Sequence, residues 1–128
     1  MPRQFTVEEA NALLPTLAPM LEELRDVAKR LIEVRDELAT ISPAGRLNGM
    51  AQRVLQLEVE AAASAALADG LLQQLSDAGV EVKDPLTGLI DFRSWRGRQE
   101  VYLCWRLGEG PIAWWHALDA GIQGRRPL

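Results

Sequence analysis

The chain has 128 residues, of which 48% are hydrophobic and 25% charged, the composition of a single globular domain. No apolar run reaches the roughly 18 residues that a bilayer-spanning helix needs, and no apolar segment follows the first charged residue as in a secretory signal. We therefore expect a cytoplasmic protein without membrane contact. The net charge of −4 disfavours a protein held on nucleic acid by charge alone. A single cysteine excludes an internal disulfide.

A capping box indicates where the first helix begins. Thr6 precedes an apolar run and Glu9 follows three residues later, the spacing at which each side chain bonds the other's backbone N–H. Pro15 and Pro19 lie soon after this start. Because proline lacks a backbone donor and crowds the preceding turn, the two prolines predict a break or kink between residues 14 and 19.

Heptad repeats then predict a helical hairpin over residues 1–78. Two apolar series recur every seven residues: Leu17, Leu24, Leu31 and Leu38, and Met20, Val27, Val34 and Ile41. This is the pattern of a coiled-coil seam. The motif Ser42-Pro43-Ala44-Gly45 predicts the end of the first helix, and a second helix is expected over residues 47–77. The short connection makes the helices antiparallel, and we expect a homodimer in which two hairpins form a four-helix arrangement.

The pattern changes from helix to strand after Gly79, and residues 79–128 predict a small β element with a C-terminal tail. Strands are expected at residues 80–83, 89–93, 99–107 and 112–116, followed by a turn at 118–121 and an extended tail. Residues 99–107 show the clearest alternation of apolar and polar side chains. The sequence therefore predicts one α+β domain over residues 1–128, with a long antiparallel helical hairpin followed by a small antiparallel sheet.

Several motifs resemble those of a known family. They are Phe5-Thr6-Val7-Glu8-Glu9-Ala10-Asn11, Gly79-Val80-Glu81-Val82-Lys83-Asp84, Gly88-Leu89-Ile90-Asp91-Phe92, Glu100-Val101-Tyr102-Leu103-Cys104-Trp105, Trp115-His116 and Leu118-Asp119-Ala120-Gly121. Together they resemble a small bacterial family known only as domain of unknown function 2203 (DUF2203). The resemblance covers nearly the whole chain and implies a helical hairpin with a small β element. It brings no established reaction, cofactor or partner.

Residues typical of metal sites gather in the predicted sheet. His116 and Asp119 are three apart, a spacing that turns both side chains to one side of a helical turn. Asp91 and Glu100 lie on neighbouring predicted strands and come within reach of each other. One imidazole with two or three carboxylates suits Mn²⁺, Fe²⁺ or Zn²⁺. Cys104, on the predicted face of Glu100, is a candidate fourth ligand, a reactive thiol or a small buried hydrophobe.

The same residues have a structural interpretation. His116 bonded to Asp119 or Glu100 would hold the end of the last strand, and Glu100 paired with Arg93 or Arg106 would tie neighbouring strands together. Asp91 would then only accept backbone N–H bonds near its turn. In that case the polar cluster stabilises the sheet and carries no chemistry.

Three functions remain open from the sequence. The leading hypothesis is a small divalent-metal-binding protein, extending to a metal-dependent enzyme, with its site on the C-terminal β element. The alternative is a non-enzymatic dimeric scaffold or adaptor that acts through its helices, on itself or on another protein. The third is a stacking surface for single-stranded nucleic acid or a nucleotide, built from the tryptophans, the tyrosine and the arginines of residues 93–115. Interleaved acids and the negative net charge disfavour this third function.

Overall fold

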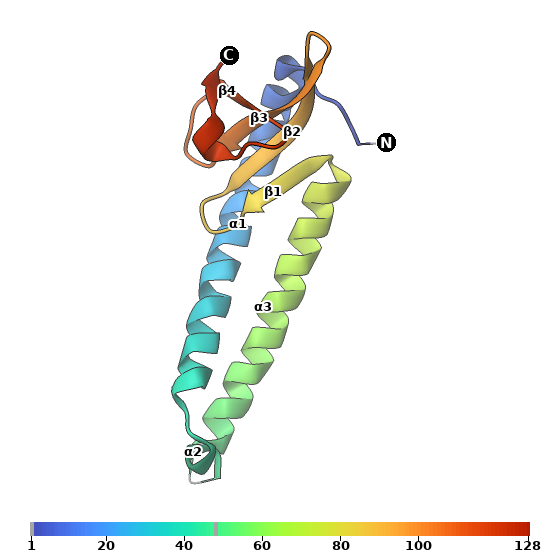
Figure 1. Cartoon of the computed structure of the whole chain (residues 1–128). Coiled ribbons are helices and arrows are strands. Elements are labelled where there is room, and N and C mark those ends of the chain that lie inside the picture. The colour runs from blue at the N-terminus through green and yellow to red at the C-terminus, as the bar shows by residue number, and fades with distance from the viewer. Residues whose placement is uncertain (1, 48) are drawn as a thin grey trace.

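The computed structural model describes residues 2–47 and 49–128 and shows a helical hairpin followed by one antiparallel sheet (Figure 1). The helices are α1 (Val7–Thr40), α2 (Pro43–Leu47) and α3 (Ala51–Asp77). The strands are β1 (Val80–Asp84), β2 (Leu89–Arg96), β3 (Gln99–Arg106), β4 (Trp114–Ala117) and β5 (Arg126–Pro127), with the 3₁₀ helix η1 (Ile122–Gly124) before β5. The α+β fold predicted from the sequence is confirmed. No helix among the described residues is long and apolar enough to span a membrane.

The first helix begins as predicted but does not break. The Glu9 amide donates to Oγ1 of Thr6 over 3.1 Å, and the Thr6 amide donates to the Glu9 carboxylate over 3.0 Å. Helix α1 then continues through Pro15 and Pro19, so the predicted break is wrong. Both prolines are exposed, which leaves the carbonyls that lose a donor on the side open to water. Burial of the opposite side of α1 against α3 and the sheet offsets the lost hydrogen bonds.

The connection between the long helices contains a short helix that the sequence did not predict. Pro43 is the first residue of α2, a position where its missing N–H has no helical partner to lose. Helix α3 therefore begins at Ala51, four residues later than the expected start at residue 47. Two exposed ion pairs join the antiparallel helices, Arg30 with Glu60 and Arg53 with Glu37. Part of the hairpin extends beyond the sheet (Figure 1).

The sheet is a simple meander. Its order is β1-β2-β3-β4-β5, and every pair of neighbours is antiparallel. Alternate side chains face the hairpin and form one core with the first half of α1 and the end of α3. Members of this core are Phe5, Ala10, Leu17, Leu21, Leu24, Leu71, Leu75, Val80, Ile90, Phe92, Val101, Leu103, Trp105, Ile112 and Trp115. The other face of the sheet therefore carries the polar side chains of β1–β4.

Gly88 and Gly97 form a matched pair for a test of the turn between β1 and β2. Both have a positive φ, +69° and +63°, but a Cβ at Gly88 would lie 2.5 Å from Cβ of Leu107, whereas nothing lies within 4 Å at Gly97. Alanine strains the backbone at either position, and only Gly88→Ala adds a clash. We expect Gly88→Ala to lower the free energy of unfolding by about 1–3 kcal/mol more than Gly97→Ala, measured by urea denaturation. Equal losses would contradict this view of the turn.

Candidate metal site

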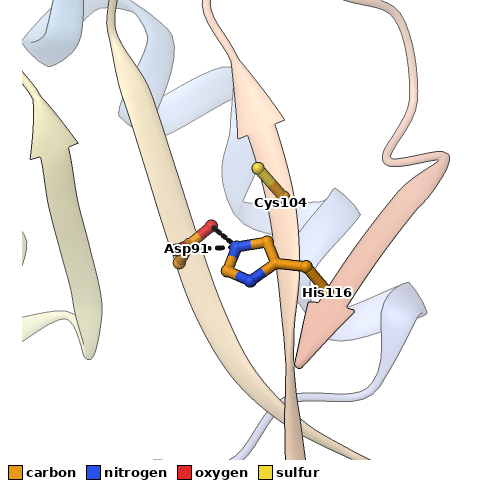
Figure 2. A group of neighbouring side chains, drawn as sticks. All are labelled: Asp91, Cys104 and His116. Carbon is orange, nitrogen blue, oxygen red and sulfur yellow. Dashed lines mark hydrogen bonds and ion pairs between the residues drawn. The ribbon is translucent and has the colours of Figure 1, made fainter. Parts of the chain in front are cut away.

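Three side chains of metal-binding type meet on the face of the sheet that points away from the helices (Figure 2). Asp91 comes from β2, Cys104 from β3 and His116 from β4. Asp91 and Cys104 are directly opposite each other, and His116 lies opposite Tyr102, two residues from Cys104. Their strand neighbours point the other way, into the core: Ile90, Phe92, Leu103, Trp105 and Trp115. Alternation along three adjacent strands thus brings the three side chains together.

The group is compact and buried. One candidate ligand atom from each residue lies within 4.8 Å of the other two, and the side chains of Asp91, Cys104 and His116 belong to residues only 1–2% exposed. Nε2 of His116 lies 3.1 Å from both carboxylate oxygens of Asp91. Nδ1 lies 2.8 Å from the carbonyl oxygen of Ala117. Because a carbonyl only accepts, Nδ1 carries a hydrogen, and Nε2 is the nitrogen directed at the group.

Burial favours the protonated forms of Asp91 and Cys104. Loss of solvent raises the pKa of Asp91 above its ordinary value, and the neighbouring His116 opposes that rise. Burial likewise raises the pKa of the Cys104 thiol to about 11, against the opposing effect of Arg125. A thiol that keeps its proton at neutral pH is a poor nucleophile, and the imidazole faces Asp91 in place of the sulfur. The arrangement therefore does not support the reactive-thiol interpretation of Cys104.

An ion pair between Arg125 and Glu109 lies beside the sulfur of Cys104. Nε of Arg125 donates to Sγ of Cys104 over 3.3 Å. The two other nitrogens of this guanidinium donate to the two carboxylate oxygens of Glu109, each over 2.7 Å. The fork holds the guanidinium against the sulfur, where an N–H donor stabilises a thiolate. Sequence reasoning missed Arg125 and Glu109, because they are 16 residues apart and meet only when the chain after β4 folds back.

A cavity of about 240 Å³ adjoins the three side chains. It is lined by Asp91, Cys104 and His116, by Lys83, Leu89 and Tyr102, and by the segment after β4 with Leu118, Ala120, Gly121 and Ile122. Several water molecules, at about 30 Å³ each, or one small ligand would fill this volume. The polar group thus has space beside it into which a coordinated water or substrate fits.

The structure brings together two of the four predicted ligands and places the other two elsewhere. Asp91 and His116 are in contact, whereas Asp119 is exposed in the turn after β4. The helical three-residue spacing does not apply to His116 and Asp119, because His116 is in a strand. Glu100 instead accepts hydrogen bonds from Arg93 and from Gln4. The pairing of Glu100 with Arg93 agrees with the structural alternative for that residue.

The tryptophans do not form one continuous surface. Trp105 and Trp115 are buried in the core, with Trp105 donating its indole N–H to the Gly110 carbonyl over 2.8 Å. Trp95 is 56% exposed, and the guanidinium of Arg125 lies over the half-buried Trp114. Stacking of successive bases needs several exposed rings side by side, so this arrangement does not support the nucleic-acid hypothesis.

Comparison with known proteins gives the family. A family described as "Uncharacterized conserved protein (DUF2203)" matches residues 3–128. The chain belongs to this family. The resemblance inferred from the sequence motifs is thereby confirmed over nearly the whole chain. Searches of the curated proteins and of the solved structures found no match. The family description names no activity, so the function has to be argued from the site itself.

Proposed function

We propose that this protein binds one divalent transition-metal ion through Asp91, Cys104 and His116. The observation that carries the proposal is the convergence of a carboxylate, a thiol and an imidazole nitrogen within 4.8 Å, buried beside a cavity. Four-coordinate zinc in catalytic sites takes three protein ligands and keeps one position for water or substrate. The thiol favours Zn²⁺ or Fe²⁺ over Mn²⁺, because a soft ligand suits the former ions better.

The surroundings of two ligands support this proposal. Metal-bound histidines usually donate their second ring N–H to a carboxylate or a backbone carbonyl, and His116 already does so to Ala117. Arg125 places a donor against the sulfur that metal binding would turn into a thiolate. Both contacts orient the donor atoms toward one point before any ion arrives.

A bound ion with an open position implies metal-dependent enzyme chemistry. Zn²⁺ lowers the pKa of its bound water to about 7 and polarises a carbonyl or phosphoryl oxygen. The cavity would hold a small substrate against that position, with Lys83 and Tyr102 on its wall. The single cysteine, used as a thiolate ligand, fits a reducing compartment such as the cytoplasm.

A dimeric scaffold is the second candidate, and one observation favours it. Large apolar side chains on α3 are exposed, with Leu55 and Val59 each 61% and Leu67 46% accessible. Apolar surface of this kind on a helix marks an interaction face more often than a free surface. The two candidates are compatible, since the metal site lies on the sheet and the exposed face on the hairpin.

Elemental analysis of protein purified without a histidine tag or chelator tests the proposed metal site. We expect close to one Zn²⁺ or Fe²⁺ per chain, its loss in His116→Ala with helical circular dichroism retained, and its retention in Asp119→Asn. The Asp119 variant is the matched control, because it removes an exposed carboxylate that lies outside the group. Absence of metal in the wild type, together with no calorimetric binding of added Zn²⁺, Fe²⁺ or Mn²⁺, would refute the proposal.

A further inference from the structure

The outer face of α3 has no charged residue over most of its length. At about 100° per residue, the side directly opposite the buried Val54, Leu57, Leu71 and Leu75 carries eight uncharged residues between positions 52 and 73, followed by Asp77 at the end of the helix. The eight are Gln52, Leu55, Val59, Ala62, Ala63, Ala66, Gly70 and Gln73, and all of them are exposed. We call this set the α3 outer face. A solvated helix normally places its charges there, so the face is unusual for a surface that only meets water.

The partner helix of the same hairpin shows the contrast. Exposed positions of α1 are rich in charge, among them Glu22, Glu23, Asp26, Lys29, Arg30, Glu33, Arg35 and Asp36. Helix α3 itself packs on α1, on α2 and, at its C-terminal end, on β1. In the described part of the chain, no strand and no second long helix lies along its outer side (Figure 1). The exposed surface of α1 is therefore charged, whereas the outer face of α3 is largely uncharged.

Gly70 gives an independent indication that another chain approaches here. It lies inside α3, where glycine is the least favourable residue after proline, and its φ is not positive. A Cβ at this position would meet nothing within 4 Å in the single chain. The isolated protein thus has no conformational or packing need for glycine at position 70. Close contact with a second backbone would supply one.

We infer that the α3 outer face pairs with the same face of a second copy, antiparallel about a two-fold axis near Ala62 and Ala63. In that register each large residue meets a small one, Leu55 against Gly70 and Val59 against Ala66. Gln52 then lies opposite Gln73, where the amides can bond each other. Antiparallel pairing about this axis places both members of every pair on the α3 outer face, as an isologous interface requires.

Charge disfavours a membrane as the occupant of this face, and the size of the face sets the expected strength of the pairing. Helix α3 carries one basic and four acidic residues, so it is repelled by an anionic membrane surface. The face runs from Gln52 to Gln73, about 32 Å at 1.5 Å per residue, and is one helix wide. Two such faces bury on the order of 1,000 Å² in total, at the lower end for specific association, so we expect a reversible dimer. This pairing gives a row of four helices with both α3 helices in the centre.

Sedimentation of the full-length protein over about 1–500 µM tests the inference. We expect the mass to rise from 14.2 kDa toward twice that value, and Ala63→Glu to shift the dissociation constant at least tenfold. Ala39→Glu is the control, since it makes the same exchange at an exposed position of α1. A monomer throughout, association only with another protein, or equal sensitivity to both substitutions would overturn the inference.

Disulfide trapping then tests the orientation. In the antiparallel register, residues 63 of the two copies are offset by about 1.5 Å along the axis and residues 55 by about 22 Å. We expect oxidised Ala63→Cys to form a covalent dimer and Leu55→Cys to form none, given the short Cα separation that a disulfide needs. Cys104 is buried and does not compete. Trapping at both positions would indicate a parallel pair and overturn the proposed register.

Discussion

Asp91→Asn is expected to abolish most Zn²⁺ binding while leaving the metal-free protein as stable as the wild type. The carboxylate is one of three proposed ligands, and an amide oxygen binds Zn²⁺ far more weakly than a carboxylate does. Loss of an outer hydrogen-bond partner of a metal ligand already costs about 10–100-fold in affinity. Replacement of the ligand itself should therefore exceed about 100-fold.

The free energy of unfolding should not fall together with the Zn²⁺ affinity, because asparagine can form hydrogen bonds with the same neighbouring side chains. Its amide nitrogen donates to Nε2 of His116, which accepts when Nδ1 carries the hydrogen for Ala117. Its amide oxygen remains an acceptor for the Cys104 thiol. The substitution also removes a buried carboxyl group whose pKa is raised by loss of solvent, an ionisable group that costs stability when charged. We expect the free energy of unfolding to change by less than about 1 kcal/mol, or to increase.

Two measurements on one sample separate the hypotheses. Calorimetric titration with Zn²⁺ reports the affinity, and urea denaturation in the presence of a chelator reports the stability. If the polar group only stabilises the sheet, the wild type and Asp91→Asn will both show no Zn²⁺ binding, and the substitution will have no metal affinity to lower. Glu100→Gln serves as a control with the opposite pattern, because Glu100 pairs with Arg93 and lies outside the group. That variant should keep Zn²⁺ affinity and lose some stability.

The sequence predicted the fold well because the periodic signals were local. The heptads of α1 appear in the structure as a buried helix stripe, and the apolar positions of β3 face the core as the alternation predicts, although the central residues of β3 are buried on both sides. The error at Pro15 and Pro19 has a tertiary cause, since packing of the opposite side of α1 keeps the helix continuous. For the segment after β4 the sequence predicts only a turn and an extended tail. Helix η1 and strand β5 in this segment depend on contacts with β4 that no local sequence pattern predicts.

The candidate site was only partly predictable from the sequence, because its residues are brought together by contacts between strands that are distant in the chain. Asp91 and His116 were named from residue type, and they meet because β3 lies between β2 and β4 in the sheet. The sequence leaves three roles open for Cys104, and only its register opposite Asp91 places it with the other two residues. Asp119 was favoured by helical spacing in a segment that is in fact a strand followed by a turn. Arg125 reaches the sulfur through a fold-back that the sequence does not reveal.

Zn²⁺ binding is expected to release two protons at about pH 6, one from the thiol and one from the Asp91–His116 contact. The pKa of Cys104 is raised to about 11, so the sulfur keeps its proton at all lower pH values until the metal displaces it. Nε2 and the carboxylate are 3.1 Å apart and both are acceptors without a proton, so one proton lies between them in the metal-free state. Metal binding displaces both the thiol proton and the proton between Asp91 and His116.

The number of protons released determines how the Zn²⁺ affinity changes with pH. A ligand that must lose protons binds more tightly as pH rises, by about tenfold per pH unit for each proton displaced. Two protons give about 100-fold per unit, and the gain from the thiol continues toward pH 11 because that pKa is raised. The measurement belongs below pH 7, where a zinc-bound water still keeps its proton. Titration calorimetry in two buffers of different ionisation enthalpy gives the number of protons directly.

Cys104→Ser provides the decisive comparison for that count. Serine keeps the size of the side chain and holds its proton on binding, so the release should fall from two protons to one, with affinity reduced by at least about 100-fold. Arg125→Gln is the graded control. It removes the donor from the sulfur without removing a ligand, so the proton number should stay at two while affinity falls about 10–100-fold. Equal release from the wild type and Cys104→Ser would show that the sulfur does not bind the metal, and the site would then be reduced to Asp91 and His116.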